Sequence, residues 1–308
     1  MEPLSLSETK EIIDELDFYS QQAMTFGFEV RVYFNGTLKE NAAGVQAFYD
    51  KAVELGRKKF KYVAVNDNER FKKVKKDTFD MLPFWASDAC EDPAYLLYLK
   101  GGKHKDSVND WNFVYDEASG PTWLRLMVPA EEGANHYDTA RALLTLAAEH
   151  LDLTSGYAGY GAVIQEDYDS DSSESNFHAC RARFLGIEFL DPLPARALFK
   201  EHLSAVNWLT LINGAMVERA GGVEAVKGRL DHEGVQLFPL EKGLILQAGE
   251  APTTGDVNRK ADVSAYQAVG KALQPIGIPV TAAHVAKYRQ GDPRYDFLYR
   301  FVQPGEDS

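Results

Sequence analysis

The chain has 308 residues, a length that fits one large domain or two smaller ones with a substantial core. Hydrophobic residues make up 45% of it and aromatic residues 12%, which is typical of a folded globular protein and argues against extended disorder. The 46 acids exceed the 33 bases, for a formal net charge of -13. An acidic protein of this kind is not expected to bind nucleic acid directly, and a basic protein is the favoured partner.

The first half of the sequence alternates between the hydrophobic periods of helices and strands. Helices are predicted at residues 7–22 with Ser7 as N-cap, at 42–56 ended by Gly56, and at 137–150. Strands are predicted at residues 26–34, 60–65, 95–100, 111–115, 123–128 and 157–164. In the strand 26–34, apolar residues alternate with Glu29, Arg31 and Tyr33, which predicts burial of one face only.

A low-complexity segment, QEDYDSDSSESNF, occupies residues 165–177 and combines five acids with four serines. It has too little apolar area to bury, so we expect a solvated loop or linker there. We place the boundary between two halves in this segment. The prediction is an N-terminal α+β half over residues 1–170 and a C-terminal α+β half over residues 171–308.

The second half contains the clearest pattern. It predicts a strand at 206–212 that carries Trp208, a helix at 222–230, and two strands joined by the turn Glu241-Lys242-Gly243. A helix at 263–273 and a last strand at 295–302 follow. We expect Trp208 to be buried, and Gly243 to supply the backbone freedom of a tight hairpin. Both halves therefore read as α+β, of a ferredoxin-like sandwich type with mainly antiparallel sheets.

A search for reactive groups yields no catalytic constellation. Gly156, Gly159 and Gly161 resemble a phosphate-binding loop, but they lie between a predicted helix and a strand, so we interpret them as close-packing or bulge positions. The seven histidines are scattered without the spacing of helical metal ligands. We therefore expect no catalytic, cofactor-binding or metal-binding residues and no enzyme, although carboxylates that pair only in space remain possible in principle.

Two other polar features have structural interpretations. In the segment GDVNR (residues 255–259), Asp256 or Asn258 is expected to form turn hydrogen bonds, and Asp262 is expected to cap the following helix. Residues 57–76 hold nine bases and two acids with aromatics among them. This composition fits nucleic-acid contact, but a solvated face or an internal partner for the acidic surface is favoured.

The cysteines and the N-terminal segment bear on the compartment. Cys90 and Cys180 lie far apart, outside any Cys-x-x-Cys motif, and are expected to be buried free thiols. The N-terminal segment has acids where a signal peptide needs bases, and no window approaches about 18 consecutive apolar residues. We expect a cytoplasmic protein without a membrane span.

Four segments in the second half carry a resemblance to a known family. They are FLGIEF at 184–189, VNWLTLI at 206–212, GLILQAG at 243–249, and P-x-x-GDVNR at 252–259 followed by Tyr266. In their order and spacing they resemble the type VI secretion system immunity family. Members of that family are paired with antibacterial nuclease effectors of the virus-type replication-repair class, within the restriction-endonuclease-like superfamily.

The resemblance implies an immunity protein that binds a cognate nuclease toxin and covers its DNA-binding or active face. Two alternatives stay open: an enzyme on an α+β scaffold with an unrecognised acidic cleft, and an adaptor or chaperone for the effector. For contact with a basic nuclease the sequence offers the acidic segment, whose candidate partner-binding residues are Glu166, Asp167, Tyr168, Asp169, Asp171 and Glu174.

Overall fold

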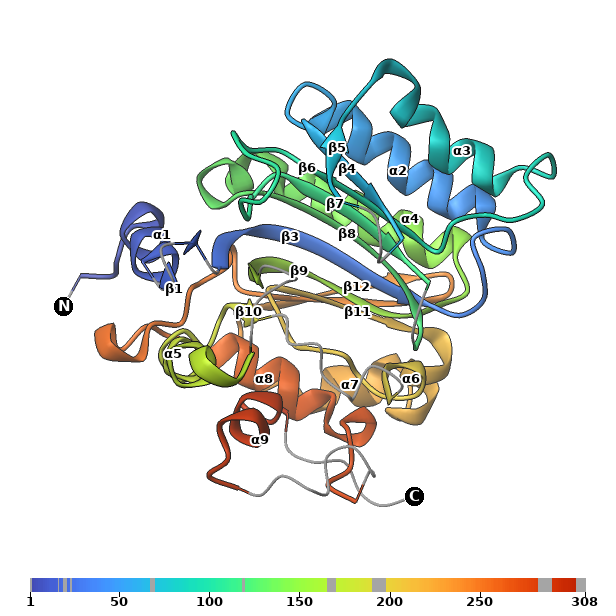
Figure 1. Cartoon of the computed structure of the whole chain (residues 1–308). Helices are drawn as coiled ribbons and strands as arrows, with labels where there is room; N and C mark the ends of the chain where they lie inside the picture. Colours follow the sequence, from blue (N-terminus) through green and yellow to red (C-terminus); the bar gives the residue numbers. More distant parts are fainter. Residues whose placement is uncertain are drawn as a thin grey trace.

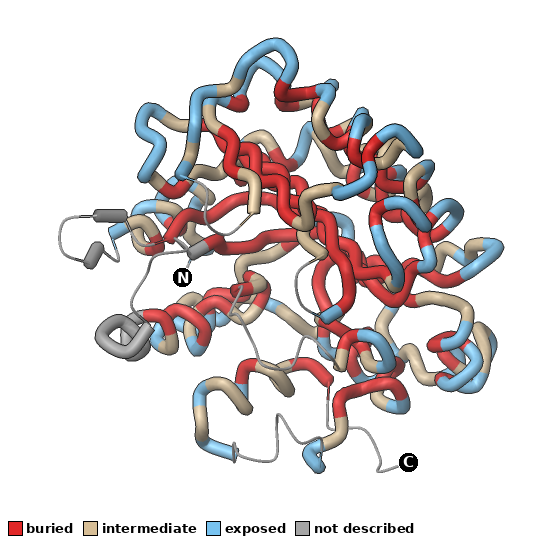
Figure 2. Tube along the Cα trace, turned by 45° about the vertical axis from the view of Figure 1, so that its right-hand side comes forward, coloured by how far each residue is buried: buried red, intermediate tan, exposed pale blue. Residues whose placement is uncertain are grey.

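The structure is a computed structural model that describes residues 2–15, 17–18, 21–22, 24–66, 70–117, 120–164, 170–189, 198–281 and 290–302. Within these ranges, one sheet of 11 strands crosses the middle of the molecule and helices cover both of its faces (Figure 1). The central strands of the sheet are deeply buried (Figure 2). No helix in the described ranges is both long and apolar enough to cross a membrane.

The strands of the large sheet are β3 (Met24–Phe34), β4 (Tyr62–Val65), β5 (Lys72–Lys73), β6 (Leu96–Lys100), β7 (Asn112–Asp116), β8 (Thr122–Pro129), β9 (Leu153–Ile164), β10 (Glu188–Phe189), β11 (Leu209–Asn213), β12 (Val235–Leu240) and β13 (Gly243–Ala248). Their order is β12-β13-β11-β9-β3-β8-β7-β6-β4-β5, with antiparallel neighbours throughout. The short strand β10 pairs with β9 in parallel. A separate hairpin joins β1 (Asp17–Phe18) to β2 (Gln21–Gln22).

The helices are α1 (Leu6–Asp14), α2 (Ala42–Gly56), α3 (Met81–Ala86), α4 (Tyr137–His150), α5 (Ser170–Arg183), α6 (Gly214–Arg219), α7 (Val223–Arg229), α8 (Ser264–Ala272) and α9 (Pro293–Leu298). In Figure 1, α2, α3 and α4 lie on one side of the sheet and α5 to α9 lie on the other. Helices α2 and α4 have the predicted bounds, and both bury the apolar residues of their amphipathic faces.

The α+β class and the mainly antiparallel sheet are confirmed, but two ferredoxin-like halves are not. Strands from both predicted halves join the same sheet, because β9 pairs with β3 on one side and with β11 on the other. The boundary at residue 170 falls between β9 and α5. The two stretches of chain on either side of this boundary both contribute strands to one sheet. The division into two halves stays a prediction.

The prediction that β3 is buried on one face only is wrong. All 11 of its residues are buried, including Glu29, Arg31 and Tyr33 on the polar face. Phe28, on the apolar face, lies 5.5 Å from the ring of Tyr137 in α4. On the opposite face the Tyr33 ring lies 5.2 Å from the ring of Phe199. The second covering layer comes from residues far along the chain, so the local alternation could not reveal it.

Three other predicted elements differ in extent or type from the structure. Helix α1 is capped by Ser5 instead of Ser7 and ends at Asp14. Residues 170–177, predicted as part of a loop, belong to helix α5, since Phe177, Cys180 and Phe184 are buried at helical spacing. The predicted last strand at 295–302 is wrong, because Pro293–Leu298 is helix α9, with Asp292 as N-cap and proline in its first turn.

The hairpin of β12 and β13 is confirmed, but the reason for its glycine is different. Leu240 pairs with Gly243, so the turn is Glu241-Lys242, and none of these residues has positive φ. A Cβ at position 243 would lie 2.4 Å from the carbonyl oxygen of Ile212 on β11. Gly243 is therefore required for close approach of the two strands rather than for backbone freedom.

Candidate functional site

A group of charged side chains is buried on the face of the sheet that lies opposite α4. Glu29 and Arg31 of β3 and Arg125 of β8 are 0%, 1% and 4% exposed. The hydroxyl of Tyr157 donates to Glu29 Oε1 at 2.9 Å, and Arg31 Nη2 lies 3.8 Å from Glu29 Oε2. Arg125 Nε donates to the side-chain oxygen of Asn112 at 2.9 Å. The three charged groups are thus part of the interior of the fold.

Burial controls the protonation of this group. Desolvation raises the pKa of the Glu29 carboxyl, because its effect exceeds the opposing attraction of Arg31 and Arg125. Desolvation, followed by repulsion from Arg31, lowers the pKa of Arg125. Space for Glu29 depends on a neighbouring glycine, because a Cβ at Gly161 of β9 would lie 2.5 Å from the Glu29 side chain. The interpretation of the glycines in β9 as close-packing positions is confirmed.

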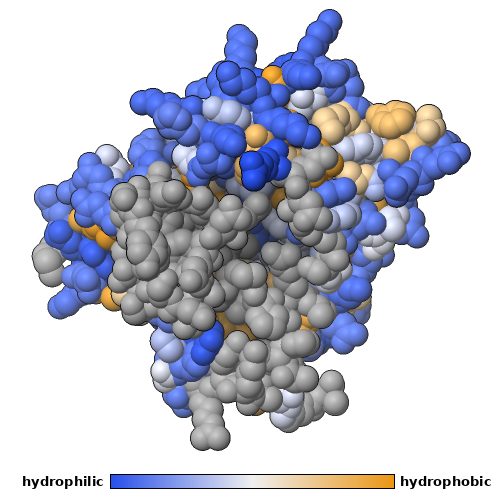
Figure 3. Space-filling model, in the orientation of Figure 1, coloured by the Kyte–Doolittle hydropathy of each residue, from blue (hydrophilic) through white to orange (hydrophobic). Residues whose placement is uncertain are grey.

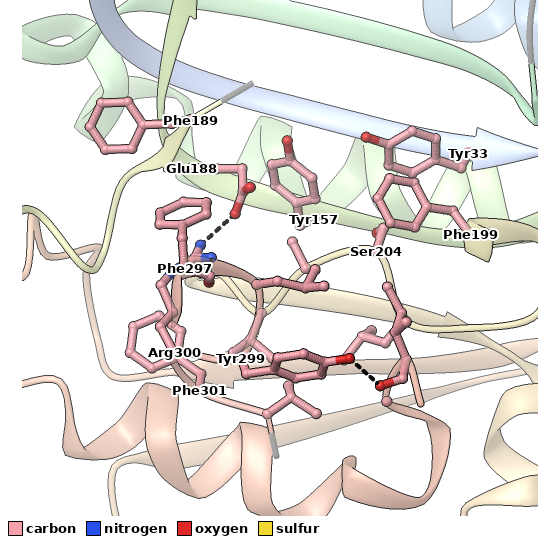
Figure 4. Close-up of a pocket in the computed structure, with 17 residues that line it drawn as sticks. Tyr33, Tyr157, Glu188, Phe189, Phe199, Ser204, Phe297, Tyr299, Arg300 and Phe301 are labelled. Carbon is pink, nitrogen blue, oxygen red and sulfur yellow. Dashed lines mark hydrogen bonds and ion pairs between the residues drawn. The ribbon is translucent and has the colours of Figure 1, made fainter. Parts of the chain in front are cut away.

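A small cavity adjoins these residues between the sheet and the C-terminal helix (Figure 4). It measures about 50 Å³, which is room for no more than a few water molecules. The hydroxyls that line it are engaged in hydrogen bonds: Tyr299 donates to the carbonyl of Ile278 at 2.9 Å, and Ser204 bonds to Ser155 at 3.0 Å. Because most of the other side chains that line the cavity are apolar, it is a packing gap rather than a substrate pocket.

An ion pair closes one side of the cavity. Arg300 Nη2 donates to Glu188 Oε2 of β10 at 2.5 Å (Figure 4), and both side chains are mostly buried. Arg300 Nε also donates to the carbonyl of Leu185 at 3.0 Å, and its guanidinium lies 3.7 Å from the centre of the Phe297 ring. Arg300 therefore fastens the segment that follows α9 to the strand that follows α5.

The family-like segments meet beside this ion pair. Arg183 holds Asp256 through two hydrogen bonds of 3.1 Å, and Asp256 Oδ1 also accepts from the backbone N–H of Asn258 at 3.0 Å. The N–H of Gly186 donates to the carbonyl of Thr254 at 3.1 Å. The turn-forming role predicted for Asp256 is confirmed. Asp262 likewise accepts from the N–H of Ser264 in the first turn of α8, at 2.8 Å.

Trp208, in another of the family-like segments, packs against Tyr137 of α4. Its side chain is 2% exposed, its ring lies 4.5 Å from that of Tyr137, and its Nε1–H donates to the carbonyl of Gly249 at 3.1 Å. The predicted burial is confirmed, although Trp208 directly precedes β11 instead of lying in it. The residues that carry the family resemblance are therefore scaffold.

The acidic segment predicted to bind a partner is placed only in part. Glu166, Asp167, Tyr168 and Asp169 lie outside the described residues. Asp171 and Glu174 belong to the first turns of α5, where the structure describes the backbone but not the side chains. Their role in binding stays a prediction.

The described residues contain no group of three or more histidines, cysteines and acids that could hold a metal ion. Cys90 and Cys180 are both buried free thiols, as predicted. Sequence reasoning missed the buried Glu29–Arg31–Arg125 group, because alternation along β3 places these side chains toward solvent. No local signal identifies them, since their burial depends on residues from the other end of the chain.

The architecture is that of an α+β protein built on one large, mainly antiparallel sheet. The chain belongs to the TsiV family, described as type VI immunity for VRR-NUC, whose sequence profile matches residues 44–297. The resemblance noted in the sequence is thereby confirmed. The Pseudomonas aeruginosa T6SS protein PA0821 has a similar fold, with a TM-score of 0.71 and 19% identity over 97% of this chain and 90% of that one. No curated protein matches the chain.

Proposed function

We propose that this protein binds a cognate type VI secreted nuclease of the VRR-NUC class and neutralises it by covering its DNA-binding or active face. The observation that carries the proposal is the family match over residues 44–297. The net charge of -13 supports it, because a surface that binds DNA phosphates is basic and attracts an acidic partner. Inhibition of this kind is stoichiometric and needs no catalytic group. We place it in the cytoplasm, where the DNA to be protected lies.

The test is co-expression with a candidate cognate VRR-NUC nuclease from the same organism, followed by co-purification and a DNA-cleavage assay. The proposal expects a complex of fixed stoichiometry and complete loss of cleavage at one equivalent of the immunity protein. A toxin that cleaves DNA unchanged in the presence of a large excess of the protein would overturn it. Loss of cleavage at far less than one equivalent would instead indicate an enzyme that modifies the toxin.

A further inference from the structure

Phe84 is the most exposed large hydrophobic residue in the described part of the chain, at 52%. It lies on α3, the short helix that projects beyond α2 in Figure 1. Figure 3 shows a pale to orange patch in the same place, surrounded by hydrophilic residues. A single exposed apolar side chain is ordinary on a protein surface, so its surroundings decide whether it has a role.

The chain segment that carries Phe84 is acidic, and one base from elsewhere, Lys39, reaches it through a hydrogen bond to the carbonyl of Cys90. Residues 77–92 contain five acids and no base. All five are exposed, and none forms an ion pair with another residue that the structure describes: Asp77, Asp80, Asp88, Glu91 and Asp92. The exposed Asp50 of α2 adds to this surface, because Asp50 and Asp80 both act electrostatically on the hydroxyl of Tyr49. The bases that precede the segment, Lys75 and Lys76, are exposed as well.

The rest of α3 is firmly attached to the fold. Leu82 and Trp85 are 1% and 8% exposed and pack into the main core. Phe79 lies just before the helix, and the guanidinium of Arg57 lies 4.6 Å from the centre of its ring. The helix therefore presents Phe84 from a supported platform, which lowers the entropy cost of binding through it.

We propose that this surface, with Phe84 at its centre and the acids of residues 77–92 around it, docks on the basic face of the cognate nuclease. The inference rests on the proposed function and names the contact. An aromatic side chain surrounded by polar groups is the usual arrangement of an interface hot spot. The acids match a partner whose DNA-binding face is basic, and they increase the rate of encounter. The partner is expected to offer an apolar pocket within that face.

The experiment measures binding of a catalytically inactive form of the VRR-NUC toxin to the full chain and to its variants. Phe84→Ala should raise Kd by at least about tenfold, mainly through faster dissociation. The triple variant Asp88→Lys, Glu91→Lys, Asp92→Lys should slow association several-fold at low salt and less at high salt. Both sets of positions are exposed, so thermal unfolding of the variants should match that of the wild type.

Matched controls lie on other parts of the surface. Val257, at 43% exposure, is a second exposed apolar residue, and Val257→Ala should leave Kd unchanged. The pair Glu218→Lys and Glu224→Lys changes exposed acids of α6 and α7 on the other side of the sheet, and should affect association much less.

The outcomes separate this inference from the proposed function. If the wild type binds the toxin and Phe84→Ala binds it with the same Kd, the proposed docking surface is wrong and the proposed function stands. Wild-type protein that does not bind the toxin overturns the function itself. A wild-type dimer that becomes monomeric on Phe84→Ala, with toxin affinity unchanged, would show that the surface joins two copies of the chain and would also overturn the inference.

Discussion

Arg31 of β3 and Arg125 of β8 lie directly opposite each other in the sheet, and both side chains are buried. Two like charges at paired positions repel unless other groups compensate. Here the ring of Trp123 lies 4.5 Å from the Arg31 guanidinium and 5.6 Å from that of Arg125. The Glu29 carboxyl lies beside them, with Oε2 3.8 Å from Arg31 Nη2. The interior of this acidic protein therefore contains a compact group of buried charges.

The first prediction concerns the pH dependence of Glu29. Burial raises its pKa in the folded state above the unfolded value, so its contribution to stability is largest at low pH and is lost as pH rises through the folded pKa. Glu29→Gln removes this titration. The free energy of unfolding of the wild type minus that of Glu29→Gln should fall as the pH rises above the ordinary pKa of a glutamate, about 4.3. Urea unfolding of both proteins measures it. The exposed Glu233→Gln is the control, and a constant difference for Glu29→Gln would contradict the prediction.

The second prediction concerns the attachment of the C-terminal segment through Arg300. Arg300→Ala leaves Glu188 mostly buried without its partner and should lower the free energy of unfolding by about 3 kcal/mol. Glu188→Gln combined with Arg300→Ala should cost clearly less than the two single changes together, because the unpaired charge is then removed. A double-mutant cycle by denaturant unfolding gives the coupling. Strictly additive effects would show that the pair contributes little.

The third prediction concerns Trp208 in the core. Trp208→Ala should lower the free energy of unfolding by about 3–5 kcal/mol, because it leaves a cavity against Tyr137 and Phe28. Trp208→Phe loses the hydrogen bond to Gly249 but keeps an aromatic ring in the core. Its free energy of unfolding should therefore fall by less than that of Trp208→Ala. Chemical denaturation compares the three proteins. Wild-type stability in Trp208→Ala would be incompatible with the packing described above.

The fourth prediction concerns the thiols. Burial raises the pKa of Cys180 to about 11, so little thiolate exists at neutral pH. In the native protein carrying Cys90→Ser, Cys180 should react with a chromogenic disulfide reagent at least about 100-fold more slowly than in the unfolded protein. The reaction is followed at pH 8 with and without denaturant. Rapid labelling of the native thiol would mean that α5 opens readily.

The fifth prediction concerns the acidic segment at 165–174 and rests on the proposed function. If the segment contacts the toxin, the triple variant Asp167→Lys, Asp169→Lys, Asp171→Lys should slow association several-fold at low ionic strength and less at high ionic strength. Reversal of three exposed acids elsewhere, Glu218, Glu224 and Glu233, is the control. An association rate unchanged at both ionic strengths would reduce the segment to a linker.

Local pattern was sufficient for the elements whose stability is local. The helices 42–56 and 137–150 were predicted to the residue, since each has one continuous apolar face. The turn at Glu241-Lys242 and the hydrogen bonds of Asp256 also follow from residues within a few positions. The family resemblance could be read from the sequence because its segments keep their order and spacing. In the structure these segments hydrogen-bond to one another and hold the fold together.

The tertiary structure decided the burial of the polar face of β3 and the exposure of Phe84. Glu29 and Arg31 are buried because segments more than a hundred residues away cover the sheet, and alternation along one strand carries no information on that second layer. Phe84 and Leu82 are both large hydrophobic residues. Helix α3 nevertheless turns Phe84 toward solvent and Leu82 toward the core. A sequence gives the hydrophobicity of each side chain, but which face a neighbouring layer covers is settled only when distant segments pack.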